Sequence, residues 1–201
     1  MKQAPVIPVL VVDSVDVAVP LAEALCRGGL TVLEITLRSN AALAVIEEIA
    51  RGVPQAIVGA GTVNSESQMD AVVDAGARFA VSPGFTPTLG KAAAKHQLPW
   101  LPGVCTPGEM LSAMEHGYRE LKFFPAAQSG GAAFLKALSG PFQDIVFCPT
   151  GGISAATASD YLTLDNVLCV GGSWVAPAKS VLAGRWDEIE ALATEASAFK
   201  S

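Results

Sequence analysis

Short apolar runs alternate with amphipathic segments along the whole chain, one such pair for about every 20 to 25 residues. The runs are rich in Val, Ile and Leu, which is typical of buried β-strands. Between them, apolar residues recur at helical spacing, and many of these segments begin with a helix-capping Ser, Asp, Asn or Thr. The pattern predicts strands at residues 6–11, 32–37, 56–60, 79–82, 100–102, 121–124, 145–149 and 167–170. It predicts helices at 15–27, 41–51, 65–75 and 106–116, among others, and an extra C-terminal helix at about 186–199.

Eight successive strand–helix units, with no linker and no break in composition, predict an α/β protein with one domain over residues 1–201. The fold expected is a single (β/α)8 TIM barrel with short loops, since about 200 residues is near the lower size limit for that fold. An open, doubly wound sheet is the alternative. Residues 59–62 read Gly-Ala-Gly-Thr after a predicted strand and lack the GxGxxG fingerprint, which weakens that alternative.

The composition is apolar, with 51% hydrophobic and 16% charged residues and a mean hydropathy of +0.42. Strands covered on both faces account for such an average. No apolar run approaches the ~20 residues that span a bilayer, and the run at 6–12 ends on Asp13, so neither a membrane partner nor a secretory leader is expected. The net charge is −6 without a basic patch, so no nucleic-acid partner is expected.

The cysteines and histidines indicate neither a disulfide framework nor a metal site. The four cysteines form no CxxC pair and lie in apolar surroundings, which predicts buried free thiols and a reducing cytoplasm: Cys26, Cys105, Cys148 and Cys169. His96 and His116 lie near the ends of predicted helices, and no carboxylate–histidine cluster has metal-ligand spacing. Metal catalysis is therefore not expected.

Alternation along the predicted strands divides their side chains between the helix-facing side and the barrel interior. In the second strand Leu33, Ile35 and Leu37 share the outer face, so the polar residues share the inner one: Glu34, Thr36 and Arg38. In the sixth strand Leu121 and Phe123 face outward, so Lys122 and Phe124 face inward. Because a barrel's chemistry lies at the C-terminal ends of its strands, a lysine, a carboxylate and an arginine should converge on one mouth.

Lys122 carries the strongest chemical signal because its neighbours, Leu121 and Phe123, belong to a buried strand. Burial disfavours the ammonium form, and a neutral amine is what Schiff-base chemistry on a carbonyl requires. The alternative is a lysine at a strand end that extends to solvent. Glu34 can be a general acid/base or a structural partner of Arg38 or Lys122. Arg38 offers a planar fork for a substrate carboxylate.

Two glycine-rich turns, at residues 149–154 and 170–174, follow the last two predicted strands. Barrels commonly hold a phosphate at this position with backbone N–H groups and a helix N-terminus. A single Gly-Gly pair is usually only a turn, but two at equivalent positions are more specific. Neither loop contains a lysine, so phosphate affinity should come from amides and the Ser173 hydroxyl.

Taken together, six segments resemble the 2-dehydro-3-deoxy-6-phosphogluconate (KDPG/KHG) aldolase family, in order and with matching spacing from about Val6 to Ala183: residues 32–38, 58–62, 82–84, 121–126, 147–153 and 171–174. The resemblance implies a metal-independent homotrimer of small (β/α)8 barrels with no cofactor. It implies that Lys122 is the Schiff-base nucleophile and Glu34 the general acid/base. Arg38 and Thr62 would bind the substrate carboxylate, and Pro83 and Phe124 would line the pyruvate pocket. The phosphate would be bound by Gly151, Gly152, Gly172 and Ser173. The sequence differs from many relatives in its short N-terminus and in residues 127–129, Ala-Gln-Ser, where an acidic residue is common.

The function implied by the resemblance is a class I aldolase that reversibly cleaves phosphorylated 2-dehydro-3-deoxy-6-phosphogluconate to pyruvate and glyceraldehyde 3-phosphate. Cleavage of 4-hydroxy-2-oxoglutarate or of the galactonate epimer is the close alternative, because these substrates share the pyruvate end. A non-covalent phosphosugar epimerase and a phosphosugar-binding barrel are more distant alternatives. The epimerase would need no covalent lysine, so the inward Lys122 argues against it, and a binding barrel gives no reason for Glu34, Arg38 and Lys122 to meet.

Overall fold

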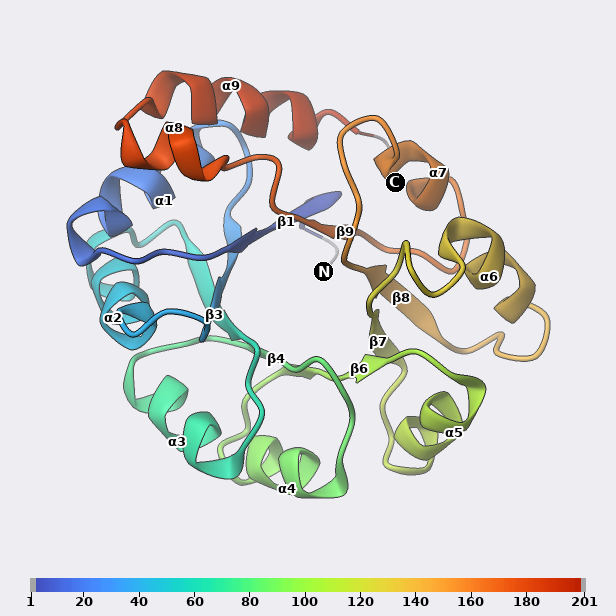
Figure 1. Cartoon of the computed structure of the whole chain (residues 1–201). Coiled ribbons are helices and arrows are strands. Elements are labelled where there is room, and N and C mark those ends of the chain that lie inside the picture. The colour runs from blue at the N-terminus through green and yellow to red at the C-terminus, as the bar shows by residue number, and fades with distance from the viewer. Residues whose placement is uncertain (1–2, 200–201) are drawn as a thin grey trace.

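Parallel strands form the centre of the molecule in the computed structural model, which describes residues 3–199 (Figure 1). One sheet has the order β5-β4-β3-β2-β1-β9 and a second the order β6-β7-β8, and every pair is parallel. Neighbouring strands in space are thus mostly neighbours in sequence, without the reversal of order that a doubly wound sheet requires. The strands are β1 (Val6–Leu10), β2 (Val32–Thr36), β3 (Ile57–Gly61), β4 (Ala80–Val81), β5 (Trp100–Leu101), β6 (Gly103–Val104), β7 (Glu120–Phe123), β8 (Val146–Pro149) and β9 (Val170–Gly172).

The helices lie outside the strands, all round them in Figure 1. The predicted segment 15–27 divides into the 3-10 turn η1 and helix α1, and the other predicted helices are confirmed to within one or two residues. The helices are η1 (Val15–Val17), α1 (Ala18–Arg27), α2 (Ala42–Gly52), α3 (Glu66–Asp74), α4 (Pro87–Lys95), α5 (Pro107–Glu115), α6 (Gly131–Leu138), α7 (Ala158–Leu162), α8 (Ala178–Leu182) and α9 (Trp186–Ser197).

Two strands differ from the prediction. The fifth strand is split into β5 and β6 at Pro102, which has no N–H to donate, although its carbonyl accepts from the Lys122 N–H at 2.9 Å. The last strand, predicted at 167–170, lies at Val170–Gly172 because Val170 pairs with Val6 at the start of β1. Single parallel bridges, Phe147 with Val167 and Thr150 with Gly171, connect β8 to the segment around β9.

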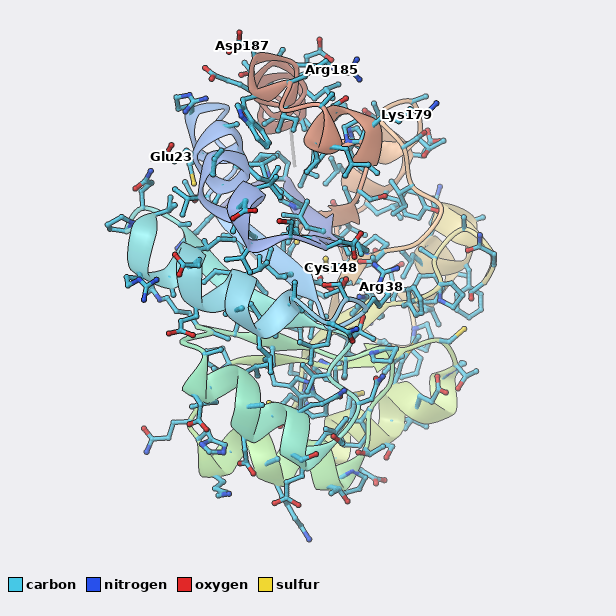
Figure 2. All side chains as sticks on the ribbon, turned by 60° about the vertical axis from the view of Figure 1, so that its left-hand side comes forward. Glu23, Arg38, Cys148, Lys179, Arg185 and Asp187 are labelled. Atoms are coloured by element: carbon cyan, nitrogen blue, oxygen red, sulfur yellow. The ribbon has the colours of Figure 1, made fainter. Side chains whose placement is uncertain are left out.

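Alternating strand positions build two apolar layers. The larger cluster lies between strands and helices and includes Leu33, Ile35, Leu121 and Phe123, which confirms the predicted outer face. A smaller inner cluster comprises Ile7, Val32, Val81, Leu101, Cys148 and Cys169. Glu34 and Lys122 also point inward, next to this inner cluster: Glu34 lies two residues after Val32 on β2, and Lys122 pairs with Cys148. Figure 2 shows Cys148 inside the molecule, whereas Glu23 and Asp187 lie on the outer surface of α1 and α9.

The sequence predictions for cysteine and histidine are partly confirmed. All four cysteines are free; Cys148 and Cys169 are buried, whereas Cys26 and Cys105 are only half-buried because one lies on a surface helix and the other in a loop after a strand. His96 and His116 are the C-cap residues of α4 and α5, as expected. Over residues 3–199, no cluster of three or more potential ligand side chains could hold a metal ion, and none of the helices is long and apolar enough to cross a membrane.

Candidate active site

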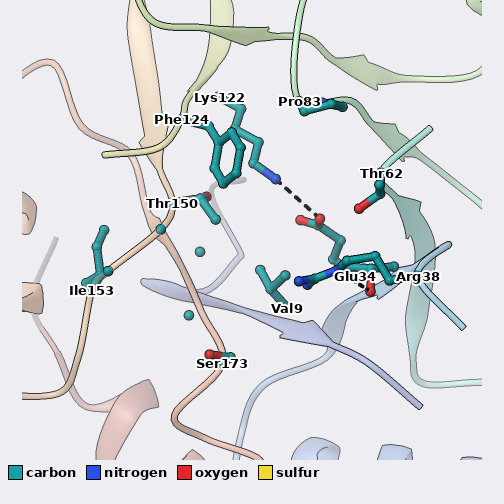
Figure 3. A pocket seen from close by; sticks show the side chains of 15 residues that line it. Val9, Glu34, Arg38, Thr62, Pro83, Lys122, Phe124, Thr150, Ile153 and Ser173 are labelled. Carbon is teal, nitrogen blue, oxygen red and sulfur yellow. Dashed lines mark hydrogen bonds and ion pairs between the residues drawn. The ribbon is translucent and has the colours of Figure 1, made fainter. Parts of the chain in front are cut away.

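A cavity of about 330 Å³ opens at the C-terminal ends of the strands (Figure 3). Carboxyl ends of parallel strands meet at one edge, so residues far apart in sequence reach the same space. All ten candidate residues line it: Glu34, Arg38, Thr62, Pro83, Lys122, Phe124, Gly151, Gly152, Gly172 and Ser173. Five more residues complete the lining: Val9, Thr36, Thr150, Ile153 and Gly171.

Lys122 and Glu34 form a buried pair at the inner end of this cavity. The Lys122 Nζ donates to Glu34 Oε1 at 3.4 Å, although the two residues are 88 positions apart in the chain. Lys122 is 6% exposed and Glu34 3% exposed, so both groups are shielded from bulk water. The Nζ lies 5.1 Å from the centroid of the Phe124 ring. The alternative of a lysine that extends to solvent is therefore wrong, and Figure 3 shows the side chain directed into the cavity.

The Glu34 carboxylate occupies space that the neighbouring strand leaves free. A Cβ added at Gly61, in β3, would lie 2.1 Å from Glu34 Oε1, so any side chain there would displace the carboxylate. In the sequence, the Gly-Ala-Gly segment lacked a dinucleotide fingerprint and contributed to the family resemblance, but neither observation explained its glycines. The structure shows its local role: Gly61 makes room for Glu34, and Gly59 makes room for the Phe79 ring.

Arg38 follows the end of β2 and is fixed by a hydroxyl instead of a carboxylate. Its Nε donates to Thr36 Oγ1 at 3.2 Å, and that hydroxyl donates to the Leu10 carbonyl in β1 at 2.9 Å. Within the described residues Arg38 makes no salt bridge, so of the two ion-pair partners considered for Glu34, Lys122 is the one found. The guanidinium therefore remains available for an anion in the cavity.

Thr62, which comes directly after β3, has a backbone φ of +61°. A β-branched residue in this left-handed region is a genuine outlier, and such outliers cluster at functional sites. Pro83 lies across the cavity on the turn after β4 (Figure 3). That turn is held by Ser82, whose hydroxyl donates to the Gly84 carbonyl at 2.6 Å and accepts from the Trp100 indole at 3.1 Å.

The glycine-rich loops form the end of the cavity away from the Lys122–Glu34 pair, where Figure 3 places Ile153 and Ser173. Gly151 and Gly152 have φ values of +102° and +72°, which strongly favour glycine. A Cβ at Gly172 would lie 1.9 Å from the Trp174 ring. The charged residues that line the cavity are Glu34, Arg38 and Lys122, so this end offers backbone amides and a hydroxyl to a ligand.

Comparison with known proteins identifies the family of this fold and site. The family profile "KDPG and KHG aldolase" matches residues 1–192. The chain belongs to the KDPG/KHG aldolase family. It is 52% identical to the KHG/KDPG aldolase of Escherichia coli K12, covering 98% of this chain and 92% of that one. It is 46% identical to the 2-dehydro-3-deoxy-phosphogluconate aldolase of Pseudomonas aeruginosa, covering 97% and 89%.

Solved structures of this aldolase family have the same fold. The KDPG aldolase of Legionella pneumophila, with pyruvate captured at low pH as a covalent carbinolamine intermediate, superposes with a TM-score of 0.96 at 45% identity, covering 98% of this chain and 96% of that one. The 2-keto-3-deoxy-6-phospho-gluconate aldolase of Zymomonas mobilis gives a TM-score of 0.93 at 47% identity, covering 99% and 95%.

Sequence reasoning missed several residues of this aldolase-family site. Thr36 was placed on the inner face but given no role, although it contacts the Arg38 guanidinium. Thr150 and Gly171 line the cavity and pack on each other; a Cβ at Gly171 would lie 2.3 Å from Thr150 Oγ1.

Below the site, contact with the Cys148 thiol, together with burial, raises the pKa of Cys169 well above its ordinary value, so Cys169 stays a neutral thiol.

Proposed function

We propose that this chain is a class I aldolase. Its substrate is 2-dehydro-3-deoxy-6-phosphogluconate, with which Lys122 forms a Schiff base. The products are pyruvate and glyceraldehyde 3-phosphate. The observation that carries the proposal is the buried Lys122–Glu34 pair, with Nζ and Oε1 3.4 Å apart, inside a cavity that Arg38 also lines. The names of the relatives and the carbinolamine of the Legionella pneumophila enzyme support it.

The pair supplies the nucleophile and the base. The Lys122 ammonium must first lose a proton, and Glu34 Oε1 is close enough to accept it. The amine then attacks the C2 carbonyl carbon, forming a carbinolamine. Glu34 returns its proton to the departing hydroxyl, so water leaves, a protonated imine remains and Glu34 is again a carboxylate. This imine is the electron sink for the next step, because it can accept the electron pair of the C3–C4 bond.

Glu34 then takes the proton of the C4 hydroxyl, directly or through a water molecule, and the C3–C4 bond breaks. Glyceraldehyde 3-phosphate leaves as the aldehyde, and an enamine remains on Lys122. Glu34 returns its proton to C3 of the enamine, and water hydrolyses the resulting imine to release pyruvate. Acid/base assistance of this kind contributes about 10²- to 10⁴-fold.

The remaining lining residues would hold the two ends of the substrate. Arg38 and Thr62 bind the carboxylate of the pyruvate half, and Pro83 and Phe124 pack against its carbon atoms. Gly151, Gly152, Gly172 and Ser173 bind the phosphate through N–H groups and the serine hydroxyl. The phosphate end has no cationic side chain, so its affinity should depend on these dipoles.

Cleavage of 4-hydroxy-2-oxoglutarate is the second candidate function, favoured by the name of the Escherichia coli relative, KHG/KDPG aldolase. That substrate needs the carboxylate and imine residues but not the phosphate loops. Rates with phosphorylated and unphosphorylated substrates separate the two activities, and both C4 epimers of the phosphorylated acid should be compared.

Three further properties belong to the proposal. The two sheets form one closed (β/α)8 barrel, supported by the bridges between β8 and the β9 segment and by the continuous chain of β5, Pro102 and β6. The protein is cytoplasmic, which its buried free thiols support. It assembles as a homotrimer, as the family resemblance implies, and a native mass measurement tests this.

The decisive experiment is borohydride reduction in the presence of pyruvate, followed by peptide mass mapping. We expect a stable reduced adduct on Lys122 and none on the exposed Lys91. Borohydride without pyruvate, and pyruvate with the Lys122→Ala variant, are the controls. An adduct on any other lysine, or none at all, would contradict the proposal.

A further inference from the structure

Thr36 joins the proposed carboxylate-binding arginine to a neighbouring strand. It is the last residue of β2, is 1% exposed and lies between Arg38 and the β1 backbone. Its hydroxyl contacts both: the Leu10 carbonyl at 2.9 Å and the Arg38 Nε at 3.2 Å. A buried hydroxyl with two polar partners is usually structural, so its orientation decides whether it bears on function.

The directions of these two hydrogen bonds follow from the atoms involved. A carbonyl oxygen can only accept, so the single hydroxyl proton of Thr36 must point at Leu10. The oxygen lone pairs then face the guanidinium, which can only donate. The threonine therefore acts as a fixed acceptor for one particular nitrogen of Arg38.

This arrangement determines which guanidinium donors are left for a ligand. Because Nε donates to Thr36, the two terminal Nη groups are left to bind a ligand. They lie in one plane and can donate to both oxygens of a carboxylate at once. No acidic side chain of the described residues forms a salt bridge with Arg38, and the nearby Glu34 pairs with Lys122 instead. Arg38 itself lies two residues beyond the end of β2.

We infer that Thr36 is a positioning residue for substrate recognition: it holds Arg38 so that its terminal edge takes the 2-oxo acid carboxylate, and thereby sets the preference for 2-oxo acids over neutral ketones. This inference rests on the proposed function, because it assigns the carboxylate to Arg38. Thr36 itself contacts neither the reacting carbon nor Lys122 in this scheme.

The test measures pyruvate methyl-proton exchange in three variants. Thr36→Val keeps the side-chain shape but removes the acceptor, whereas Thr36→Ser keeps the hydroxyl. Ser39→Ala is the matched control, since the Ser39 hydroxyl donates to the Val12 carbonyl at 2.6 Å and so anchors the same loop without contacting Arg38. Pyruvamide, which lacks the carboxylate, serves as the neutral comparison substrate.

For Thr36→Val we expect the KM for pyruvate to rise about tenfold, the scale of one hydrogen bond to a charged group, with kcat changed less than threefold. The preference for pyruvate over pyruvamide should fall by about the same factor. Thr36→Ser should restore both values, and Ser39→Ala should leave them at the wild-type level. An unchanged KM in Thr36→Val, or an equal rise in Ser39→Ala, would overturn the inference.

Failure of this inference can be told apart from failure of the proposed function. Borohydride trapping of pyruvate on Lys122 in the wild-type protein depends on the proposed function and not on Thr36. If trapping succeeds while Thr36→Val binds pyruvate normally, the aldolase assignment stands and the positioning role falls. If trapping fails in the wild type, both fall. Thermal unfolding of each variant checks that changes in KM do not follow a loss of fold.

Discussion

Adding one methyl group at Gly61 should displace the proposed acid/base, Glu34, and so reduce its activity although Glu34 itself is not replaced. In Gly61→Ala the new Cβ would lie 2.1 Å from Glu34 Oε1 and 2.7 Å from both Glu34 Cδ and Cγ. Carbon and oxygen atoms need about 3.4 Å or more to avoid repulsion, so the carboxylate must move by roughly 1.3 Å. It can move only away from β3, and its 3.4 Å contact with Lys122 Nζ will not survive intact.

The expected size of the effect follows from this displacement. A misplacement of about 1 Å in a reacting group can cost on the order of 10²-fold in rate, which lies within the 10²- to 10⁴-fold contribution of acid/base assistance. We therefore expect kcat for aldol cleavage and for pyruvate methyl-proton exchange to fall by roughly 10²-fold. The borohydride-trapped adduct on Lys122 should still form, because the amine is retained.

Overpacking by itself also destabilises a protein, typically by about 1–3 kcal/mol, so a matched control is needed. Gly59→Ala adds the same methyl two residues earlier on β3, where the atoms nearest to it would be those of the Phe79 ring, at 2.4 Å, and not the Glu34 carboxylate. We expect both variants to lose comparable thermal stability but only Gly61→Ala to lose exchange activity. Exchange within threefold of wild type in Gly61→Ala would refute the reasoning, as would an equal loss of activity in Gly59→Ala.

Three further outcomes are expected. Lys122→Ala should abolish aldol cleavage and pyruvate trapping while circular dichroism stays native; substantial turnover would rule out the nucleophile assignment. Glu34→Gln should still permit trapping on Lys122 but slow methyl-proton exchange by about 10²-fold or more, and unchanged exchange would count against its acid/base role. Hydrogen bonds from His96 and then Lys95 hold the pKa of the exposed Asp70 below 3.8, so this carboxylate adds stability above pH 3.8 that is lost as the pH falls through its lower folded-state value. Asp70→Asn should therefore lower the unfolding temperature slightly at pH 7, and this deficit should disappear once the pH has fallen through the lowered folded-state pKa; a deficit that persists in strong acid would mean that the charge is not responsible.

Much of the site could be predicted because period-two alternation is a local property. Once β2 and β7 were recognised as strands, the inward direction of Glu34 and Lys122 followed from their neighbours, and the structure confirms it. The predictions failed where pairing between distant segments decides the outcome. The last strand began later than expected because β1 sets its register, and the fifth strand is interrupted because Pro102 cannot donate to its neighbours.

The sequence by itself determined the alternation of strands and helices, the family, and the set of residue types that could carry amine chemistry. Only the tertiary structure decided that Glu34 pairs with Lys122 rather than with Arg38, that Gly61 leaves room for the carboxylate, and that the Thr36 hydroxyl accepts a hydrogen bond from the Arg38 guanidinium. The physical reason is one of range. Strand direction follows from neighbouring residues, whereas a contact of about 3 Å between side chains from different strands depends on how the whole sheet is assembled.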